Sequence, residues 1–273
     1  MPIDTLSGVV SERYLIGMRG EGGGGGGTCS SFAEECKAQL DEHGVITLHE
    51  FLTPSAVAEL VKEAEARAGE AFFTSSTHNV WLTEKDTSKE NVHIYNRQLR
   101  SGKGCIQHDQ IPQSSKLRAL YDDGSFRRFV AAVVGEKELF EYADTLSGIN
   151  VHYAGDGKNL NWHFDNSSFA VTLLLQSPKG GGQFQYVKDV RCQSQPQSDE
   201  FARVEEIVDG IEQPTTLQMR PGTLVLFRGR NSIHRVTPTE GDRQRILAVF
   251  AFNSQPGIAL SETARLTFFG RLA

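Results

Sequence analysis

NLNWHFDNSSFAVTLLLQ, residues 159–176, decides the fold of this chain. It combines an apolar run typical of a buried β-strand, FAVTLLLQ (169–176), with a polar strand end that carries His163 and Asp165. Side chains two residues apart on a strand point to the same face, so the imidazole and the carboxylate can bind one metal ion. The plainer interpretation is a hydrogen-bonded His–Asp pair at a strand end, since a His-x-Asp triplet is common by chance.

Short β-like runs separated by turn residues continue through the C-terminal half of the chain. They are INVHYAG (149–155), FAVTLLLQ (169–176), GQFQYV (182–187), TTLQM (215–219), TLVLF (223–227), HRVTP (234–238) and RILAVFAF (245–252). Several short strands at this spacing indicate a β-sandwich or barrel. We therefore expect residues 139–273 to form the β-rich core of the domain.

The N-terminal half is predicted to be mainly helical. Helices are expected at 31–40, from Pro54 to about Gly69, at 113–121 and at 124–134, with a strand in GVITLHEFL (44–52). Thr53 followed by Pro54 is a typical helix start, because threonine caps the first turn and proline suits the first helical position. These elements predict an α+β protein in which an N-terminal helical half packs on the β core.

Two stretches fall outside this pattern. Residues 1–28 include the six-glycine run 22–27, which predicts a flexible lead-in; a phosphate-binding loop is disfavoured because the GKS or GKT ending is missing. Residues 71–112 are polar and irregular, and they form either a lid over a site or a surface excursion. We expect one domain at 29–273, with helical support and lid at 29–138.

The composition is that of an ordinary globular protein of 273 residues, with 38% hydrophobic and 23% charged residues. The net charge of -6 argues against a nucleic-acid partner, because neutralising phosphates requires clustered Lys and Arg. The densest basic cluster is Arg228, Arg230 and Arg235. This cluster flanks His234 and is better suited to a site or to an anionic small-molecule substrate.

The sequence carries no secretory or membrane-spanning signal: the N-terminus lacks a basic start before an apolar run, and no stretch of 18 apolar residues occurs. The four cysteines are irregularly spaced without a CxxC pair, which favours reduced thiols over a zinc site or a disulfide framework. We therefore expect a cytoplasmic protein with no membrane partner.

A second segment, PGTLVLFRGRNSIHRVTP (221–238), places His234 at the head of a short strand after an apolar strand and a loop. A lone histidine is more often a core or surface residue than a ligand. Together, however, His163, Asp165 and His234 supply the two imidazoles and one carboxylate of the facial triad that holds Fe(II) and leaves three positions open.

A third segment, EGDRQRILAVFAF (240–252), adds Arg243 nine residues after His234. An arginine at the start of a neighbouring strand can offer a two-pronged hydrogen bond to the carboxylate of a dicarboxylate cosubstrate. Arg245 lies on the same face by alternation and is the second choice, and the Tyr153 hydroxyl is a further donor. The alternatives are a solvated surface arginine and a half-buried core tyrosine.

This combination resembles the Fe(II)- and 2-oxoglutarate-dependent dioxygenases over residues 139–270, through HFD (163–165), HRVTP (234–238) and GDR (241–243). The resemblance implies a double-stranded β-helix, or jelly roll, of the cupin type, with the N-terminal helices packed on one sheet. It also implies Fe(II) and 2-oxoglutarate as cofactors and O₂ as cosubstrate. His163, Asp165 and His234 would bind the metal, and the cofactor-binding residues would be Arg243, Tyr153 and Arg245.

NWHFDNSSFAVTLLLQ (161–176), GGQFQYVKDVR (181–191) and LTFFGR (266–271) look more closely like a microbial branch of free-amino-acid hydroxylases and halogenases. In the halogenating members a glycine replaces the metal carboxylate and leaves room for chloride. This chain has Asp165 there, which disfavours halogenation. The resemblance implies oxidation of a C–H bond in a small polar substrate, such as a free amino acid or a derivative, by hydroxylation, desaturation or ring closure.

Several alternatives stay open at this point. The spacing of Tyr153 to His163 looks like that in prolyl hydroxylases and keeps a peptidyl substrate possible, and a cupin-like binding protein without catalysis is the second class. A zinc hydrolase is disfavoured because no HExxH motif occurs. The candidate substrate-binding residues are Asn166, His152, Arg228 and Asn253. The apolar tail ARLTFFGRLA (264–273) suits either a homodimer interface or packing on the core.

Overall fold

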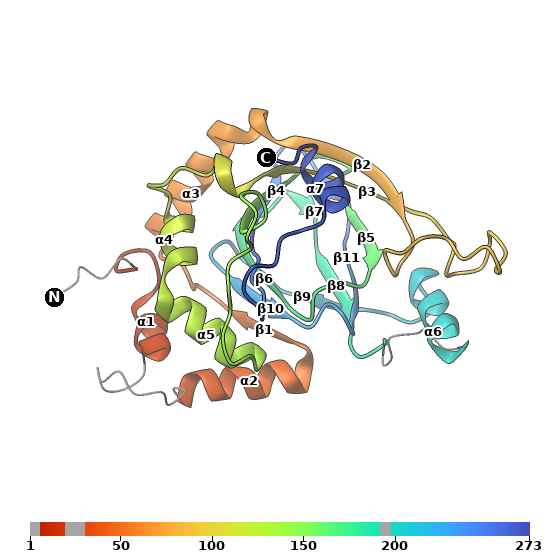
Figure 1. Ribbon diagram of the computed structural model, residues 1–273, viewed down its shortest axis with the longest axis horizontal. Helices are drawn as coiled ribbons and strands as arrows, with labels where there is room; N and C mark the ends of the chain where they lie inside the picture. The colour runs from red at the N-terminus through yellow and green to blue at the C-terminus, as the bar shows by residue number, and fades with distance from the viewer. Residues whose placement is uncertain (1–5, 20–30, 192–197) are drawn as a thin grey trace.

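The computed structural model describes residues 6–19, 31–191 and 198–273, and its centre is a pair of antiparallel β-sheets (Figure 1). The larger sheet contains, in spatial order, β1 (Val45–Leu48), β10 (Leu224–Phe227), β6 (Ala170–Gln176), β13 (Arg245–Phe250), β4 (Ile149–Ala154), β3 (Leu99–Ile106) and β2 (Phe72–His78). The smaller sheet contains β5 (Leu160–His163), β11 (Ile233–Val236), β8 (Phe184–Val187) and β9 (Thr215–Leu217). A short ribbon pairs β7 (Gly180–Gly181) with β12 (Thr239–Glu240).

The helices lie on the outside of this core (Figure 1). Those before the first long strand pair are α1 (Glu12–Arg19), α2 (Ser31–His43), α3 (Pro54–Arg67) and the 3-10 turn η1 (Ala68–Glu70). Those that follow are η2 (His108–Gln110), α4 (Lys116–Asp122), α5 (Gly124–Val134), α6 (Ser198–Val208) and α7 (Glu262–Phe269). Helices α1 to α5 lie on the larger-sheet side and α6 on the opposite side of the molecule, which confirms the predicted α+β jelly roll.

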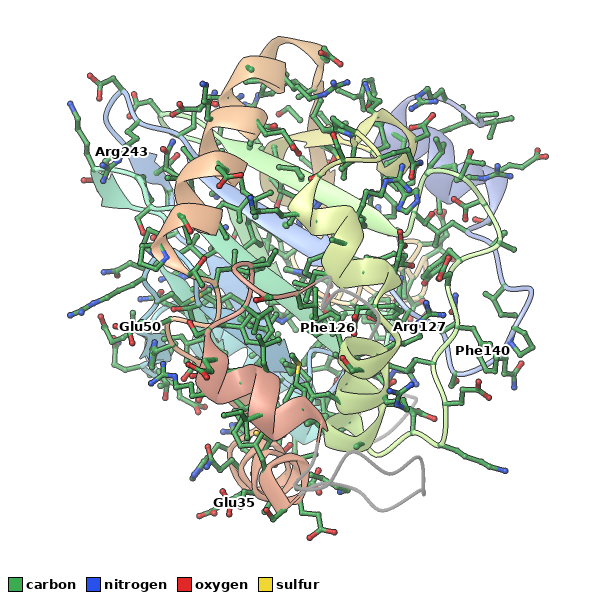
Figure 2. All side chains as sticks on the ribbon, turned by 90° about the vertical axis from the view of Figure 1, so that its left-hand side faces the viewer. Glu35, Glu50, Phe126, Arg127, Phe140 and Arg243 are labelled. Carbon is green, nitrogen blue, oxygen red and sulfur yellow. The ribbon has the colours of Figure 1, made fainter. Side chains whose placement is uncertain are left out.

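Alternation along the strands of the larger sheet separates a helix-facing side from an inner side. On β4, Val151 and Tyr153 are buried in the core that includes Leu60 and Phe126 of the helices (Figure 2). The alternate residues Asn150 and His152 point to the inner side and are only half-buried. Because the side-chain period of a strand is two, these neighbours in sequence reach different environments.

The helix boundaries follow from local chemistry. Thr53 caps α3 as expected, since its hydroxyl accepts a hydrogen bond from the Ala56 amide at 3.2 Å, with Pro54 in the first turn. Helix α5 begins after the Asp123 cap and ends where Gly135 adopts a left-handed conformation (φ 82°), a common helix terminus.

The segment 71–112 is not a lid over the inner face of the sheets. Its ends are β2 and β3, which pair along their whole length at the edge of the larger sheet. The intervening stretch packs on the outside of the smaller sheet, where Trp81 contacts Phe164 and its indole donates a 2.8 Å hydrogen bond to Glu200 of α6. The sequence did not predict these two strands because β2 is largely exposed and β3 is polar and interrupted by two glycines.

The described part of the lead-in is packed rather than loose. Leu6, Val9 and Val10 are buried, and the Tyr14 ring of α1 packs in a tilted arrangement against that of Phe51 at a ring-centroid distance of 5.4 Å. The six-glycine run at 22–27 lies outside the described residues. Apolar side chains of a turn and of α1 therefore pack part of residues 1–28 against the core, although the glycine run had predicted a flexible lead-in.

At the C-terminus, Phe269 of α7 packs onto the core beside Cys105 and Leu146, whereas Leu266 and Phe268 are exposed. The tail thus covers one end of the core, and the homodimer stays a prediction. None of the helices within the described ranges is both long enough and apolar enough to cross a bilayer.

Candidate metal centre

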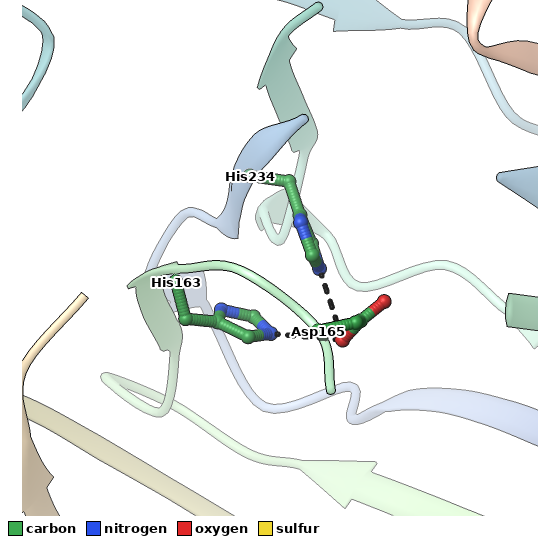
Figure 3. A group of neighbouring side chains, drawn as sticks. All are labelled: His163, Asp165 and His234. Atoms are coloured by element: carbon green, nitrogen blue, oxygen red, sulfur yellow. Dashed lines mark ion pairs between the residues drawn. The ribbon is translucent and has the colours of Figure 1, made fainter. Parts of the chain in front are cut away.

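Two strands of the smaller sheet bring the three predicted metal ligands together (Figure 3). His163 ends β5 and pairs directly with His234 on β11, so both imidazoles project from the inner face of the same sheet. Asp165 follows β5 by two residues and turns its carboxylate toward both rings. The pairing register therefore joins positions 71 residues apart in sequence.

The donor atoms of this group lie close enough to share one ion. The Asp165 Oδ1 atom is 3.6 Å from Nε2 of His163 and 3.6 Å from Nε2 of His234, and the three donor atoms lie within 4.8 Å of one another. Among the described residues, this is the one group of three His, Cys, Asp or Glu side chains with such spacing.

Backbone carbonyls fix the orientation of both histidines. Nδ1 of His163 lies 2.8 Å from the Asn161 carbonyl oxygen, and Nδ1 of His234 lies 3.0 Å from that of Ser232. A carbonyl only accepts, so each Nδ1 carries the proton and donates it, which leaves the Nε2 lone pair for a metal. This arrangement is the usual support of metal-binding histidines.

The charges of the group also suit a divalent cation. Burial, followed by the neighbouring His234, lowers the pKa of His163 to about 3. Burial alone would raise the pKa of Asp165, but His234, His163 and Lys103 together lower it to about 2. At neutral pH the site therefore holds a neutral His163 imidazole and a carboxylate, and a metal need not displace a proton from either group.

Gly229, in the loop before β11, makes room for the metal carboxylate. A Cβ atom at this position would lie 1.8 Å from Oδ2 of Asp165, far inside contact distance. The Asp165 amide also donates a 3.0 Å hydrogen bond to the Gly229 carbonyl. The glycine thus lets the two loops approach and leaves room for the Asp165 carboxylate beside the histidines. The sequence FRGRNS gave no periodic signal for this role.

Ser101 on β3 links the larger sheet to the first ligand. Its hydroxyl oxygen accepts a 2.9 Å hydrogen bond from the Asn161 amide and lies 2.7 Å from Nε2 of His78. Asn161 in turn orients His163. These contacts connect β3 to the edge of the smaller sheet that carries His163, which we call the metal edge. Sequence patterns did not predict them.

Arg245, the second choice for the cosubstrate carboxylate, faces the interior. It is 7% exposed, and burial lowers the pKa of its guanidinium to about 10. It lines a cavity of about 260 Å³ together with Gly182, Phe184 and Met219. The Phe184 ring lies 5.5 Å from that of His234, so the cavity wall reaches the metal group.

Arg243, the first choice, lies at the molecular surface, where its guanidinium donates to the Pro178 carbonyl at 3.3 Å (Figure 2). It precedes β13 in a turn, so strand alternation does not place it on the face of Arg245. The Tyr153 hydroxyl points into the helix layer and donates to the Ala64 carbonyl at 2.8 Å. Neither placement supports the predicted contact with a cosubstrate.

Of the four candidate substrate residues, His152 alone faces the inner side of the larger sheet. Arg228 donates to the Val134 carbonyl and to Asp41, which ties it to the helix layer. Asn166 is exposed on a loop, and Asn253 pairs through its backbone with Phe140. Arg228 and the Asn253 backbone therefore take part in local structure, and Asn166 lies at the surface.

The comparisons with known proteins agree with this geometry. The family profile of Halogenase D matches residues 29–265. A search of curated protein sequences found no match.

Several solved structures share the fold. They include the 2-oxoglutarate-dependent epimerase SnoN of nogalamycin biosynthesis, with TM-score 0.56 and 14% identity over 81% of this chain and 80% of that chain. The carbocyclase SnoK of the same biosynthesis has TM-score 0.54 and 13% identity over 89% and 94% of the two chains. An oxidoreductase of the 2OG-Fe(II) oxygenase family from Burkholderia pseudomallei has TM-score 0.50 and 17% identity over 86% and 94%. The profile match shows that the chain belongs to the Halogenase D family, and its fold is the one found in Fe(II)- and 2-oxoglutarate-dependent oxygenases.

Proposed function

We propose that this protein is a non-haem oxygenase that uses Fe(II), 2-oxoglutarate and O₂ to oxidise an unactivated C–H bond of a small polar substrate. The observation that carries the proposal is the orientation of His163, Asp165 and His234. Their donor atoms converge, and both histidines present Nε2 because Nδ1 is engaged by a carbonyl. This donor set fits Fe(II) and leaves positions for a cosubstrate and O₂.

The bound iron, with its cosubstrate and O₂, would supply the oxidising chemistry. The protein's own contribution is orientation and charge. We propose that Arg245, rather than Arg243, binds the far carboxylate of 2-oxoglutarate. Its buried guanidinium lines the cavity whose wall, through Phe184, reaches His234. A buried arginine is well suited to hold a carboxylate through two parallel hydrogen bonds.

Asp165 favours oxygenation over halogenation, although the family is named for a halogenase. Its carboxylate occupies the place between the two histidines that a halide ligand would need. Gly229 leaves space for this carboxylate beside the two histidines. We therefore propose hydroxylation, or desaturation or ring closure, as the outcome.

The substrate we propose is a free amino acid or a derivative of one, in keeping with the sequence resemblance. The half-buried His152 on the inner face is the candidate that the geometry favours for contact with it. A peptidyl substrate is the alternative that the assay below separates. A cytoplasmic location and a homodimer stay predictions.

The experiment is an anaerobic titration of the purified protein with Fe(II) and 2-oxoglutarate, followed by exposure to O₂ with a panel of free amino acids and proline-containing peptides. We expect a weak visible charge-transfer band and substrate-dependent release of succinate. Mass spectrometry then gives the outcome: a gain of one oxygen for hydroxylation, or a loss of two hydrogens for desaturation or ring closure. Stimulation by peptides alone would overturn the proposed substrate class.

A further inference from the structure

A cationic wall lines the inner face of the larger sheet, opposite the metal ligands; it consists of the charged side chains Lys103 and Arg245 and of the imidazole of His152, which burial keeps neutral. Lys103 Nζ lies 3.2 Å from Nε2 and 3.4 Å from Nδ1 of His152, and no described carboxylate forms an ion pair with Lys103 or Arg245. Unpaired cations surrounded by protein are costly, so their presence calls for an anionic ligand.

Strand register assembles this wall. Cys105 on β3 pairs with His152 on β4, so Lys103, two residues earlier, lies on the same inner face one step along the sheet. On the other side of β4, Leu247 of β13 pairs with His152, which places Arg245 on that face as well. The two cations and His152 thus come from three adjacent strands.

Within the wall, Lys103 is the cation whose charge acts on Asp165 of the metal group. Burial lowers the pKa of Lys103, and the Asp165 carboxylate is one of the charges that oppose this shift. Lys103 also follows Ser101, whose hydroxyl supports the strand of His163. An anion bound by Lys103 would therefore lie next to the metal rather than in a remote pocket.

When the charges of the proposed site are counted, Lys103 is left without a counter-ion. The two positive charges of Fe(II) are offset by Asp165 and by the metal-binding carboxylate of 2-oxoglutarate. The far carboxylate of 2-oxoglutarate is offset by Arg245. One buried cation remains, and a buried charge without a counter-ion is strongly unfavourable. A substrate that brings one carboxylate would complete the balance.

We propose that Lys103, with His152 beside it, is the subsite that binds the carboxylate of the organic substrate and so positions that substrate next to the metal. This inference rests on the proposed function, because the charge balance assumes Fe(II) and 2-oxoglutarate. The same carboxylate chemistry has a second source, which is 2-oxoglutarate itself. The charge balance favours the substrate as the source, and the experiment separates the two.

The first arm measures 2-oxoglutarate affinity from the charge-transfer band of the anaerobic Fe(II) protein. Wild type, Lys103→Met and Lys103→Arg are compared, with Arg245→Leu as the variant that should lose the cosubstrate. We expect the Lys103 variants to bind 2-oxoglutarate within about two-fold of wild type, because Arg245 holds its far carboxylate. Circular dichroism melting shows whether each variant is folded.

The second arm uses acetate as the carboxylate probe, at saturating 2-oxoglutarate, and reads the electron paramagnetic resonance spectrum of the Fe(II)–nitrosyl protein. Acetate should change the spectrum of wild type and of Lys103→Arg. In Lys103→Met the acetate concentration needed should rise about 10- to 100-fold, the usual effect of losing a charge-assisted hydrogen bond.

Each contrary result has a separate meaning. A large loss of 2-oxoglutarate affinity in Lys103→Met would assign the subsite to the cosubstrate and overturn the proposal. An acetate response that is missing in wild type, or equal in folded Lys103→Met, would show that no anion subsite exists here while leaving the proposed function intact. A wild-type protein without any charge-transfer band would remove the proposed function and, with it, this inference.

Discussion

The metal edge of the smaller sheet and the cationic wall of the larger sheet face one interior but differ in how their side chains are held. At the metal edge, His163 and His234 are each oriented by a carbonyl, and Asp165 is confined by Gly229. In the wall, the Lys103 side chain hydrogen-bonds only to His152 among the described residues, and Arg245 has no ion-pair partner among the described carboxylates.

This difference shows which parts of the site are complete in the protein alone. A ligand set whose orientation is fixed by the backbone is prepared for a small ion. A set of unpaired cations is prepared for larger anions that bring their own charge. We infer that the metal edge determines the reaction type and that the wall determines which organic molecules bind.

The largest expected effect is at the metal edge. His234→Ala removes one of three donors and leaves Asp165 beside a single imidazole, so Fe(II) binding should be lost. Anaerobic calorimetry with Fe(II) checks this result. The control is the replacement of His49, which is distant from the triad in sequence and contacts Thr223 and the lead-in. This replacement should leave Fe(II) binding intact. Equal Fe(II) affinity in His234→Ala would show that the metal edge is not a metal site.

The next effect separates the wall from the surface. Arg245→Leu should weaken 2-oxoglutarate binding about 100-fold, because a two-pronged charge-assisted interaction contributes about 3 kcal/mol. Arg243→Leu is the matched control, since its guanidinium lies at the surface, and should change the affinity less than about two-fold. If Arg243→Leu weakened 2-oxoglutarate binding more than Arg245→Leu, Arg243 would be the arginine that binds the cosubstrate, as the sequence had favoured.

A smaller loss is expected at the contact between the loop and the metal carboxylate. Gly229→Ala puts a Cβ where Oδ2 of Asp165 lies, so Asp165 must move and metal affinity should fall about 10- to 100-fold. In an Asp165→Gly background the same change should cost little further affinity, because the clashing atoms are gone. If the losses of metal affinity added in the double variant, the effect of Gly229→Ala would not come from a clash with Asp165.

The metal-free protein should lose stability in acid. The pKa of His163 in the folded protein is about 3, below its ordinary 6.5, and that of Asp165 is about 2, below its ordinary 3.8. Both groups bind fewer protons when folded, so their contribution is present above these ordinary values and falls as pH drops toward 3. Urea unfolding between pH 7 and pH 4 measures the slope, which His163→Gln should reduce although His152 adds to it. An unchanged slope in His163→Gln would contradict the assignment.

The smallest effect concerns Tyr153, which faces the helices, whereas its neighbour His152 on β4 faces the interior. Tyr153→Phe removes the hydrogen bond to the Ala64 carbonyl and should lower the free energy of unfolding by about 1 kcal/mol. The affinity for 2-oxoglutarate should not change, because Tyr153 faces the helices. Chemical denaturation and the charge-transfer titration measure the two quantities. A selective loss of cosubstrate affinity would mean that Tyr153 reaches the interior.

The sequence predicted the metal edge better than the wall for a physical reason. His163 ends β5 and Asp165 follows it by two residues, so their closeness in sequence already brings them together, and His234 lies near the start of its own strand. Lys103, His152 and Arg245 meet only through the register of three strands, which no local pattern specifies. The sequence of β3 is polar and interrupted by glycines, so it did not predict a strand. It therefore gave no prediction of the sheet face on which Lys103 lies.

The same reasoning explains the placements of Arg243 and Tyr153. Alternation assigns a residue to a face only inside a strand, and β13 begins at Arg245 rather than at Arg243. Tyr153 lies inside β4, where the apolar Ile149 and Val151 already indicated the helix-facing side. The helices at 54–67 and 124–134 were predictable because caps and apolar spacing are local features.

The central claim is that the three ligands form an iron site at which 2-oxoglutarate binds. Its most direct test is the visible spectrum of the anaerobic protein after addition of Fe(II) and then 2-oxoglutarate. The account predicts a weak charge-transfer band in wild type, its loss in His234→Ala, and its persistence in Arg243→Leu. Absence of the band in folded wild-type protein, or an undiminished band in His234→Ala, would contradict the account.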